Sequence, residues 1–237
     1  LTQHILEFDK VKSYLTQFTV SALGKAQIDS LAVITDLLQI ETWLSEVSEI
    51  KEIRAVHGSL PLGGICDIWE SLAHARIERE ILAPTALRQI YDTLRAGKAT
   101  REFILAIDPP AYRRIQEKVE RIALLHPVEA AIRQAIDEDG EILDGASQKL
   151  KHIRRELRQT REKIQTWLQN FLQRAENQSV IQDQIITSRR DRYVIPVKAS
   201  SRGKIQGIVH DQSASGVTVF IEPLATVELN NRIASLD

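Results

Sequence analysis

The sequence predicts a mainly α protein in which a helical core is followed by a long helix and a small antiparallel β tip. Aromatic residues make up only 5% of the chain, and Leu, Ile, Ala, Glu, Gln and Arg dominate it, a composition typical of helix bundles. Before about Gln178, apolar residues recur at helical spacing. After it, Tyr193, Ile195 and Val197 alternate with other residues, which indicates a strand.

Short amphipathic helices open the chain. The first is expected around Leu6 to Leu15, and Ser21 is expected to cap the second, because a serine hydroxyl can accept a bond from a first-turn amide. A longer helix is expected to open at Thr35-Asp36 and to end near His57-Gly58. Its buried stripe is predicted to comprise Leu37, Ile40, Leu44, Val47, Ile50 and Ile53.

Proline and glycine divide the next part of the chain. Pro84 suits the first turn of a helix that we expect to end at Gly97. The acidic segment Asp137–Glu141 is expected to form a turn at the end of this series of helices. Other helices are expected at 67–77, 119–125 and 128–136, with a break at 108–110.

A long uninterrupted helix is predicted from Ser147 to about Gln178, because this stretch holds no Gly or Pro. It would be about 48 Å long at 1.5 Å per residue. Such a helix needs a partner, either from the same chain or from another one. Its heptad seam is formed by Leu150, Ile153, Leu157, Thr160, Ile164, Trp167 and Phe171.

The β tip is expected to contain strands around Tyr193–Val197 and Val217–Ile221, with a turn at Asp211–Gly216. The segment from Pro223 to Leu236 returns to helical spacing, and we expect it to run back beside the long helix and to be cut short. The predicted boundaries are 1–144 for the helical core domain, 145–178 for the long helix, 179–222 for the β module and 223–237 for the returning helix.

Positive charge is regional. The chain has a net charge of −1, yet residues 145–204 hold 14 Lys and Arg against 5 Asp and Glu. Around the first strand only Asp191 opposes the cations, so we expect contacts to the phosphates of a nucleic acid, which supply affinity and are sensitive to salt. No aromatic stacking platform accompanies them, since only Tyr193 is near. The expected nucleic-acid-binding residues are Arg189, Arg190, Arg192, Lys198, Arg202 and Lys204.

The basic stripe on the long helix has a simpler interpretation. Glu156 and Glu162 interleave with its lysines and arginines, which favours a solvated helix flank over a binding surface.

We expect no catalytic residue, cofactor site or metal site in this chain. His210, Asp211, Ser213 and Ser215 belong to one strand and turn, which cannot easily surround a substrate. The acidic turn lacks the later ligands of a calcium loop, and neither Gly97-Lys98 nor Gly203-Lys204 continues a phosphate-binding loop. The single cysteine, Cys66, excludes an internal disulfide and favours a reducing, cytoplasmic location, and no apolar run approaches a membrane span.

Five stretches together resemble the second family of bacterial MutS proteins, the paralogue that carries a C-terminal Smr nuclease domain. They are LEFDKV at 6–11, LPLGGICDI at 60–68, LAPTALRQIYDTLRA at 82–96, the run from Asp137 to Ile164, and RYVIPVKASSRGKIQGIVHDQSASGVTVFIEPLATVELNN at 192–231.

This resemblance implies a core domain, lever helices and a clamp-like tip from the first portion of such a protein. In the family, ATP and Mg²⁺ belong to an ABC-type domain and nuclease activity to the Smr domain, and both domains are absent here. The full protein is a homodimer that acts on branched DNA, where it suppresses recombination, and on ribosomal RNA of stalled, collided ribosomes. The segment itself would therefore be a non-catalytic lever and clamp that grips nucleic acid.

One alternative remains open from the sequence. The long helix and the tip could form a helical oligomerisation or protein-interaction module that does not bind nucleic acid.

Overall fold

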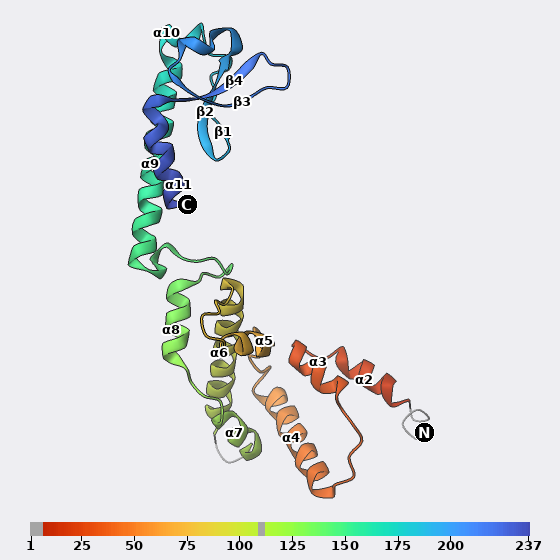
Figure 1. Ribbon diagram of the computed structural model, residues 1–237. Coiled ribbons are helices and arrows are strands. Elements are labelled where there is room, and N and C mark those ends of the chain that lie inside the picture. The colour runs from red at the N-terminus through yellow and green to blue at the C-terminus, as the bar shows by residue number, and fades with distance from the viewer. Residues whose placement is uncertain (1–6, 109–111) are drawn as a thin grey trace. The chain divides into compact units, whose positions relative to one another are not determined.

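The computed structural model describes residues 7–108 and 112–237 (Figure 1). The predicted start at Leu6 and the break at Pro109-Pro110 lie outside these residues. Two compact units make up the chain: unit 1, Leu1–Leu143, and unit 2, Asp144–Asp237. The predicted mainly α class is confirmed. None of the described helices combines the length and apolarity needed to cross a membrane.

The helices of unit 1 begin where the sequence offers caps. Ser21 Oγ accepts a hydrogen bond from Gly24 N at 3.1 Å, and Asp36 Oδ1 accepts one from Gln39 N at 3.1 Å, so first-turn amides are satisfied. The described helices are α2 (Phe8–Thr16), α3 (Ala22–Asp29), α4 (Leu37–Val56), α5 (Trp69–His74), α6 (Pro84–Leu105), α7 (Arg113–Glu120) and α8 (His126–Ala135).

The expected helix end at Gly97 is wrong. Helix α6 runs through Gly97 to Leu105, and the glycine faces Ile122 at close range. A single glycine costs a helix about 1 kcal/mol relative to alanine. Burial of Thr100 and Ile104 further along α6 outweighs that cost.

Helix α7 is fixed to α4 by acidic side chains. Glu49 Oε2 on α4 accepts a hydrogen bond from Ile115 N at 3.0 Å, and Glu46 pairs with Lys118 at 2.9 Å. The first contact satisfies an amide that the first turn of α7 leaves without a backbone partner. Tyr112, at the start of α7, is 4% exposed, and its burial together with neighbouring Glu52 raises the pKa of the phenol.

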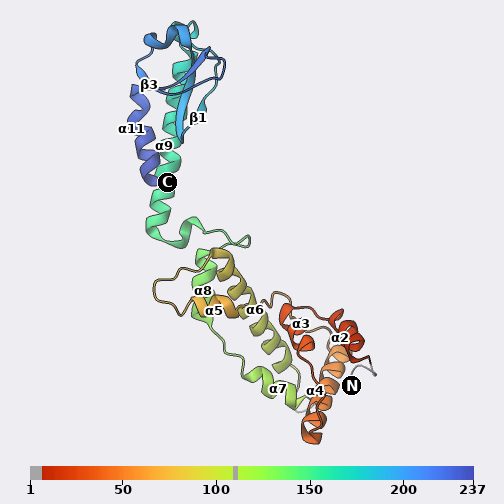
Figure 2. The ribbon, with the colours of Figure 1, turned by 45° about the vertical axis from the view of Figure 1, so that its right-hand side comes forward.

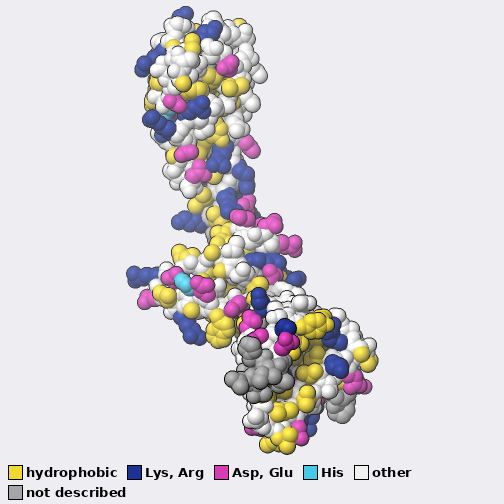
Figure 3. All heavy atoms as spheres, turned by 90° about the vertical axis from the view of Figure 1, so that its right-hand side faces the viewer, with side chains coloured by type: hydrophobic (Ala, Val, Ile, Leu, Met, Phe, Trp, Pro, Cys, Tyr) yellow, Lys and Arg dark blue, Asp and Glu magenta, His cyan; other side chains and the backbone are white. Residues whose placement is uncertain are grey.

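The predicted buried stripe of α4 is also wrong. Only Ile53 is buried, whereas Leu37, Leu44 and Val47 are 67%, 61% and 55% exposed. Apolar residues occur all around this helix, and within the described part of unit 1 only its later turns reach a core. Hydrophobic side chains accordingly show on the surface in the lower part of Figure 3.

Helix α9 (Gln148–Gln173) follows a short 3₁₀ turn η1 (Asp144–Ala146), and Ser147 Oγ caps it through Leu150 N at 3.1 Å. It ends earlier than predicted, because Arg174 is extended and α10 (Ala175–Gln178) begins anew. Asn177 Nδ2 donates to Phe171 O at 2.8 Å, so a side chain satisfies a carbonyl of the last turn.

Helix α11 (Val227–Leu236) packs beside α9 (Figures 1 and 2). Thr160, Ile164, Leu168 and Leu172 are the buried residues of α9. Of the predicted seam only Thr160 and Ile164 are buried. Trp167 and Phe171 pack against the core while partly buried, and their rings stack on one another. The reason is the partner: strand residues such as Ile195 and Ile221 share this core, so the contact does not follow the 3.5-residue repeat of paired helices.

Four antiparallel strands form one sheet in the order β1-β2-β4-β3. A 3₁₀ segment, η2 (Ala199–Lys204), leads from β2 towards β3, and η3 (Leu224–Thr226) joins β4 to α11. The strands are β1 (Thr187–Arg189), β2 (Arg192–Lys198), β3 (Gly207–Gln212) and β4 (Thr218–Pro223).

The strands differ from the simple alternation that the sequence suggested. Val194, Ile195, Pro196 and Val197 are all buried, whereas Val217 is 60% exposed in the loop between β3 and β4. Successive side chains of a strand point to opposite faces of the sheet, so the burial of four consecutive residues shows that both faces of β2 are covered here. Helices α9 and α11 and the sheet belong to one compact unit. The predicted division of this unit into a long helix, a β module and a returning helix, with boundaries at 178 and 222, stays a prediction.

Candidate nucleic-acid interface

The β1–β2 turn places Arg190 at an exposed hairpin end. Arg189 pairs with Arg192 across the strands, and the two residues between them, Arg190 and Asp191, have φ angles of 51° and 61°. Positive φ at both central residues is the geometry of a type I′ hairpin turn. The Arg190 side chain is exposed, and no hydrogen bond or ion pair joins it to the described part of the chain.

Arg189 lies over the sheet. Its guanidinium sits 4.0 Å from the centre of the Phe220 ring, and its Nε pairs with Asp211 Oδ2 at 3.2 Å. It also donates to Thr187 Oγ1 at 3.1 Å and to Ser188 O at 2.8 Å. Arg189 therefore covers a face of the sheet while 37% of its side chain stays exposed.

Arg192 belongs to a buried polar cluster. It donates to Glu222 Oε1 at 2.7 Å and to Asn231 Oδ1. Glu222 is completely buried, and it also bonds Asn230 Nδ2 at 2.8 Å and His210 Nε2 at 2.5 Å. A buried carboxylate is tolerable only with such partners, so this Arg192–Glu222–His210–Asn230 cluster is part of the architecture of unit 2.

A β-bulge aims His210 at this cluster. The register of β3 on β4 shifts between Val209 and Asp211, and the additional residue, His210, turns its ring to Glu222. Ser213 Oγ instead contacts Ser215 Oγ at 3.3 Å and accepts a bond from Thr218 N at 3.1 Å. Ser213 thus holds the turn between β3 and β4, whereas His210 and Asp211 contact Glu222 and Arg189, respectively.

Lys198, Arg202 and Lys204 follow the opposite end of β2. Lys198 Nζ donates to Ser179 O at 3.0 Å, whereas Arg202 and Lys204 on η2 are exposed and bond to no described residue. Strand β2 separates Arg192 from Lys198 by about 20 Å at 3.3 Å per residue. The six expected residues therefore form two groups, and on the face of unit 2 that Figure 3 shows, basic side chains are scattered.

Part of the basic stripe of α9 forms ion pairs within the chain. Arg154 and Arg158 each donate to Asp144 at 2.8 Å and thereby lower the pKa of its carboxyl. Arg161 pairs with Asp237 at 2.9 Å, and Glu156 accepts from Arg232 of α11 at 2.7 Å. These contacts support the interpretation of the stripe as a solvated helix flank.

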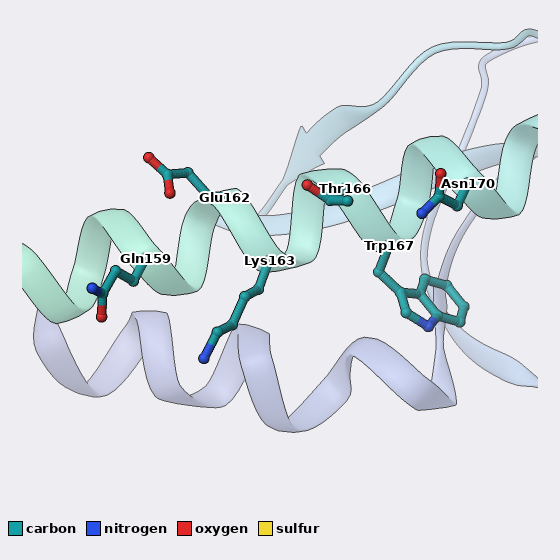
Figure 4. Close-up of a pocket in the computed structure, with 6 residues that line it drawn as sticks. All are labelled: Gln159, Glu162, Lys163, Thr166, Trp167 and Asn170. Atoms are coloured by element: carbon teal, nitrogen blue, oxygen red, sulfur yellow. The ribbon is translucent and has the colours of Figure 1, made fainter.

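An open groove of about 660 Å³ runs along one face of α9 (Figure 4). Lys163 and Trp167 point to the side on which α11 lies, whereas Glu162 points away. Trp167 stacks on Phe171 with ring centres 5.1 Å apart. All six lining residues come from this single helix, so the groove is the flank of a packed helix and not a pocket that several elements build.

The acidic turn of unit 1 is held by its own backbone. Asp137 Oδ1 accepts hydrogen bonds from Asp139 N at 3.0 Å and Glu141 N at 2.8 Å, and Gly140 adopts φ +82°. Across residues 7–108 and 112–237, no three His, Cys, Asp or Glu side chains are placed to hold a metal ion.

Sequence reasoning did not identify the partners of Arg192. Glu222 lies in an otherwise apolar strand, TVFIEP, and a charged residue at such a position is a signal for a buried ion pair. Asn230 gave no such signal, because an asparagine on a helix is ordinarily a surface residue.

Comparison of the sequence with known proteins identifies its relatives. No family model matches the chain. A protein named "Endonuclease MutS2" from Geobacillus sp. (strain WCH70) is 41% identical over 232 residues, which are 97% of this chain and 30% of that protein. Proteins of the same name from Alkaliphilus oremlandii and Bacillus cytotoxicus are 39% and 40% identical over 98% of the chain. The chain thus spans about three-tenths of the length of these relatives, and the similarity shows that it belongs to the MutS2 family.

Proposed function

We propose that this chain is a non-catalytic, nucleic-acid-gripping part of a MutS2-family protein. Its substrates would be branched DNA, where the full protein suppresses recombination, and ribosomal RNA on stalled, collided ribosomes. ATP hydrolysis, strand cleavage and homodimer formation would involve the rest of the longer protein, in the cytoplasm. Unit 1 would be the core, and unit 2 would be the lever with its clamp-like tip.

The exposed cations of unit 2 carry this proposal. Arg190, Arg202 and Lys204 are exposed and make no hydrogen bond or ion pair with any described residue. Side chains of this kind are free to replace the counterions of a phosphate backbone. They lie on a two-residue turn and on a 3₁₀ segment, where the backbone is held by the sheet.

Arg189, Arg192 and Lys198 would contribute in a second way. Each is held by partners within unit 2, and the side chains of Arg189 and Arg192 remain 37% and 25% exposed. They would add positive electrostatic potential near a bound phosphate, but their own contacts would keep these side chains from moving to bind it directly. Contacts of this type position a nucleic acid and do not read its sequence.

A charge-reversal experiment tests the proposal. Arg190→Glu, Arg202→Glu and Lys204→Glu are combined, and binding of the chain to a fluorescent four-way DNA junction is followed by anisotropy at several salt concentrations. Loss of three phosphate contacts should weaken binding at least tenfold and reduce the slope of log K against log salt by about 3.

The matched control reverses the same charge in unit 1. Lys25, Lys51 and Arg54 are exposed, and Lys25→Glu, Lys51→Glu and Arg54→Glu together should leave binding unchanged. Equal effects of the two triple variants would refute a specific role for the tip. If the chain instead forms concentration-dependent dimers and does not bind nucleic acid, the result favours an oligomerisation module. Analytical ultracentrifugation of the same samples detects such dimers.

A further inference from the structure

A second groove of unit 2 lies where α9 meets the β1–β2 hairpin. Its volume is about 380 Å³, and α9, the segment before β1, β1 itself and β2 all line it. Its polar and aromatic lining consists of Gln165, Gln169, Gln184, Thr187, Ser188 and Tyr193. We call this cavity the glutamine groove.

The chemistry of the glutamine groove is uncharged. No Lys, Arg, Asp or Glu lines it, and Leu172 and Ile186 add apolar surface. The three glutamine side chains belong to exposed residues, and their amides form no hydrogen bond within the described residues. Each amide offers two donors and an acceptor. The groove therefore suits a flat, neutral group with hydrogen-bonding edges, and it does not suit a phosphate.

The groove adjoins the cationic turn. Ser188 pairs with Tyr193 across the strands, and Arg189 pairs with Arg192 one step further along. Arg190 follows Ser188 by two residues, so at most about 7 Å of backbone separates them at 3.3 Å per residue. This separation is within the span of a single nucleotide, so one nucleotide could place its base in the groove and its phosphate at the turn.

We propose that the glutamine groove binds an unpaired nucleobase, so that the tip holds single-stranded nucleic acid by base as well as by phosphate. Glutamine amides match the edges that bases present, and Tyr193 supplies an aromatic surface beside them. A base inside a duplex has its pairing edge occupied and its faces stacked, so single strands are the substrates that can enter. This inference rests on the proposed function and narrows it to unpaired segments.

The test distinguishes binding through the bases of a strand from binding through its phosphate backbone. The chain is titrated with a fluorescent strand of twelve deoxyadenosines and with a strand of the same length made of abasic residues, which keeps the phosphates. The adenine strand should bind about tenfold more tightly. In the Gln169→Ala, Gln184→Ala double variant the two strands should bind equally, and the salt slope should stay unchanged because no phosphate contact is lost.

Gln159→Ala is the matched control, since it removes an exposed glutamine from the same helix outside this groove. It should leave the preference for adenine intact. Equal binding of the adenine and abasic strands by the unmodified chain would overturn the inference without any variant. If those strands bind equally while the charge reversal at Arg190, Arg202 and Lys204 still weakens binding at least tenfold, the proposed function stands and only the inference about the glutamine groove is refuted.

Discussion

Helix α4 is richer in apolar residues than α9, yet it buries fewer of them. Over its 20 residues α4 buries only Ile53, whereas α9 buries Ile164, Leu168 and Leu172 against the sheet and α11. The sequence predicts both segments as helices, from helical spacing and from helix start signals. Spacing within one helix does not say which other element packs against it. Whether a helix face is buried therefore depends on whether the rest of the fold provides a packing partner.

The two units also use polar contacts differently. In unit 1 a glutamate of α4 caps α7, and Lys118 pairs with Glu46 at a partly exposed position. In unit 2 a completely buried carboxylate, Glu222, connects β4 to β2, β3 and α11. The Lys118–Glu46 pair of unit 1 is partly exposed, whereas the carboxylate at the centre of the Glu222 cluster lies within the core of unit 2.

Removal of Glu222 should have the largest effect. Glu222→Ala leaves Arg192, His210 and Asn230 without their shared partner and should lower the free energy of unfolding by about 4 kcal/mol. Urea denaturation followed by circular dichroism measures it. Glu228→Ala, at an exposed position on α11, is the control and should change stability by less than about 0.5 kcal/mol. A small effect at Glu222 would mean that the cluster is dispensable.

Leucine truncation compares the two helices directly. Leu168→Ala removes a side chain that is 0% exposed and should cost about 3 kcal/mol. Leu44→Ala on α4 removes one that is 61% exposed and should cost less than about 0.5 kcal/mol. The same urea titration serves both. Comparable losses would show that α4 is covered in solution and that the contrast between the units is false.

Much of the fold could be predicted from local signals. The cap at Ser21 and the first-turn proline of α6 were expected, and the helix starts at Asp36 and Ser147 were placed correctly. Each of these signals acts within one turn of its helix. The errors concern distant contacts. Helix α6 continues through Gly97 because its later residues Thr100 and Ile104 are buried, and the buried residues of α9 depart from the predicted seam because strands replace a partner helix.

In the candidate interface, too, local features could be predicted from the sequence and distant contacts could not. The six basic residues were found from composition, and Arg190, Arg202 and Lys204 are indeed exposed. That Arg192 reaches Glu222 and Asn231 could not be predicted, because these residues are 30 and 39 positions away in the chain. The glutamine groove combines α9 with the hairpin, and no spacing within the sequence brings these segments together.

Helix caps provide a smaller comparison between the units. Ser147→Ala removes the acceptor for Leu150 N in α9, and Ser21→Ala removes the acceptor for Gly24 N in α3. Each should cost about 1 kcal/mol. Hydrogen exchange of the first-turn amides locates the effect, and exchange should accelerate only in the helix that lost its cap. Faster exchange in both helices from one substitution would show that the units are coupled.

The smallest expected effects depend on pH, and they have opposite signs in the two units. Arg154 and Arg158 hold the pKa of Asp144 below its ordinary 3.8, so this contribution to unit 2 is complete above pH 3.8 and is lost as the pH falls through the folded pKa. Glu80 raises the pKa of His74 above 6.5, so this contribution to unit 1 is complete below pH 6.5 and is lost as the pH rises through the folded pKa.

Nuclear magnetic resonance titration of the two side chains measures both shifts in one sample. Asp144→Asn should abolish the acid-side change for unit 2 and leave the His74 titration untouched, and Glu80→Gln should do the converse. Both pairs are solvent-exposed, so added salt should reduce both shifts. A His74 titration that moves when only Asp144 is replaced would contradict the local origin of the two shifts, because Glu80 is the main cause for His74 and Arg154 and Arg158 are the causes for Asp144.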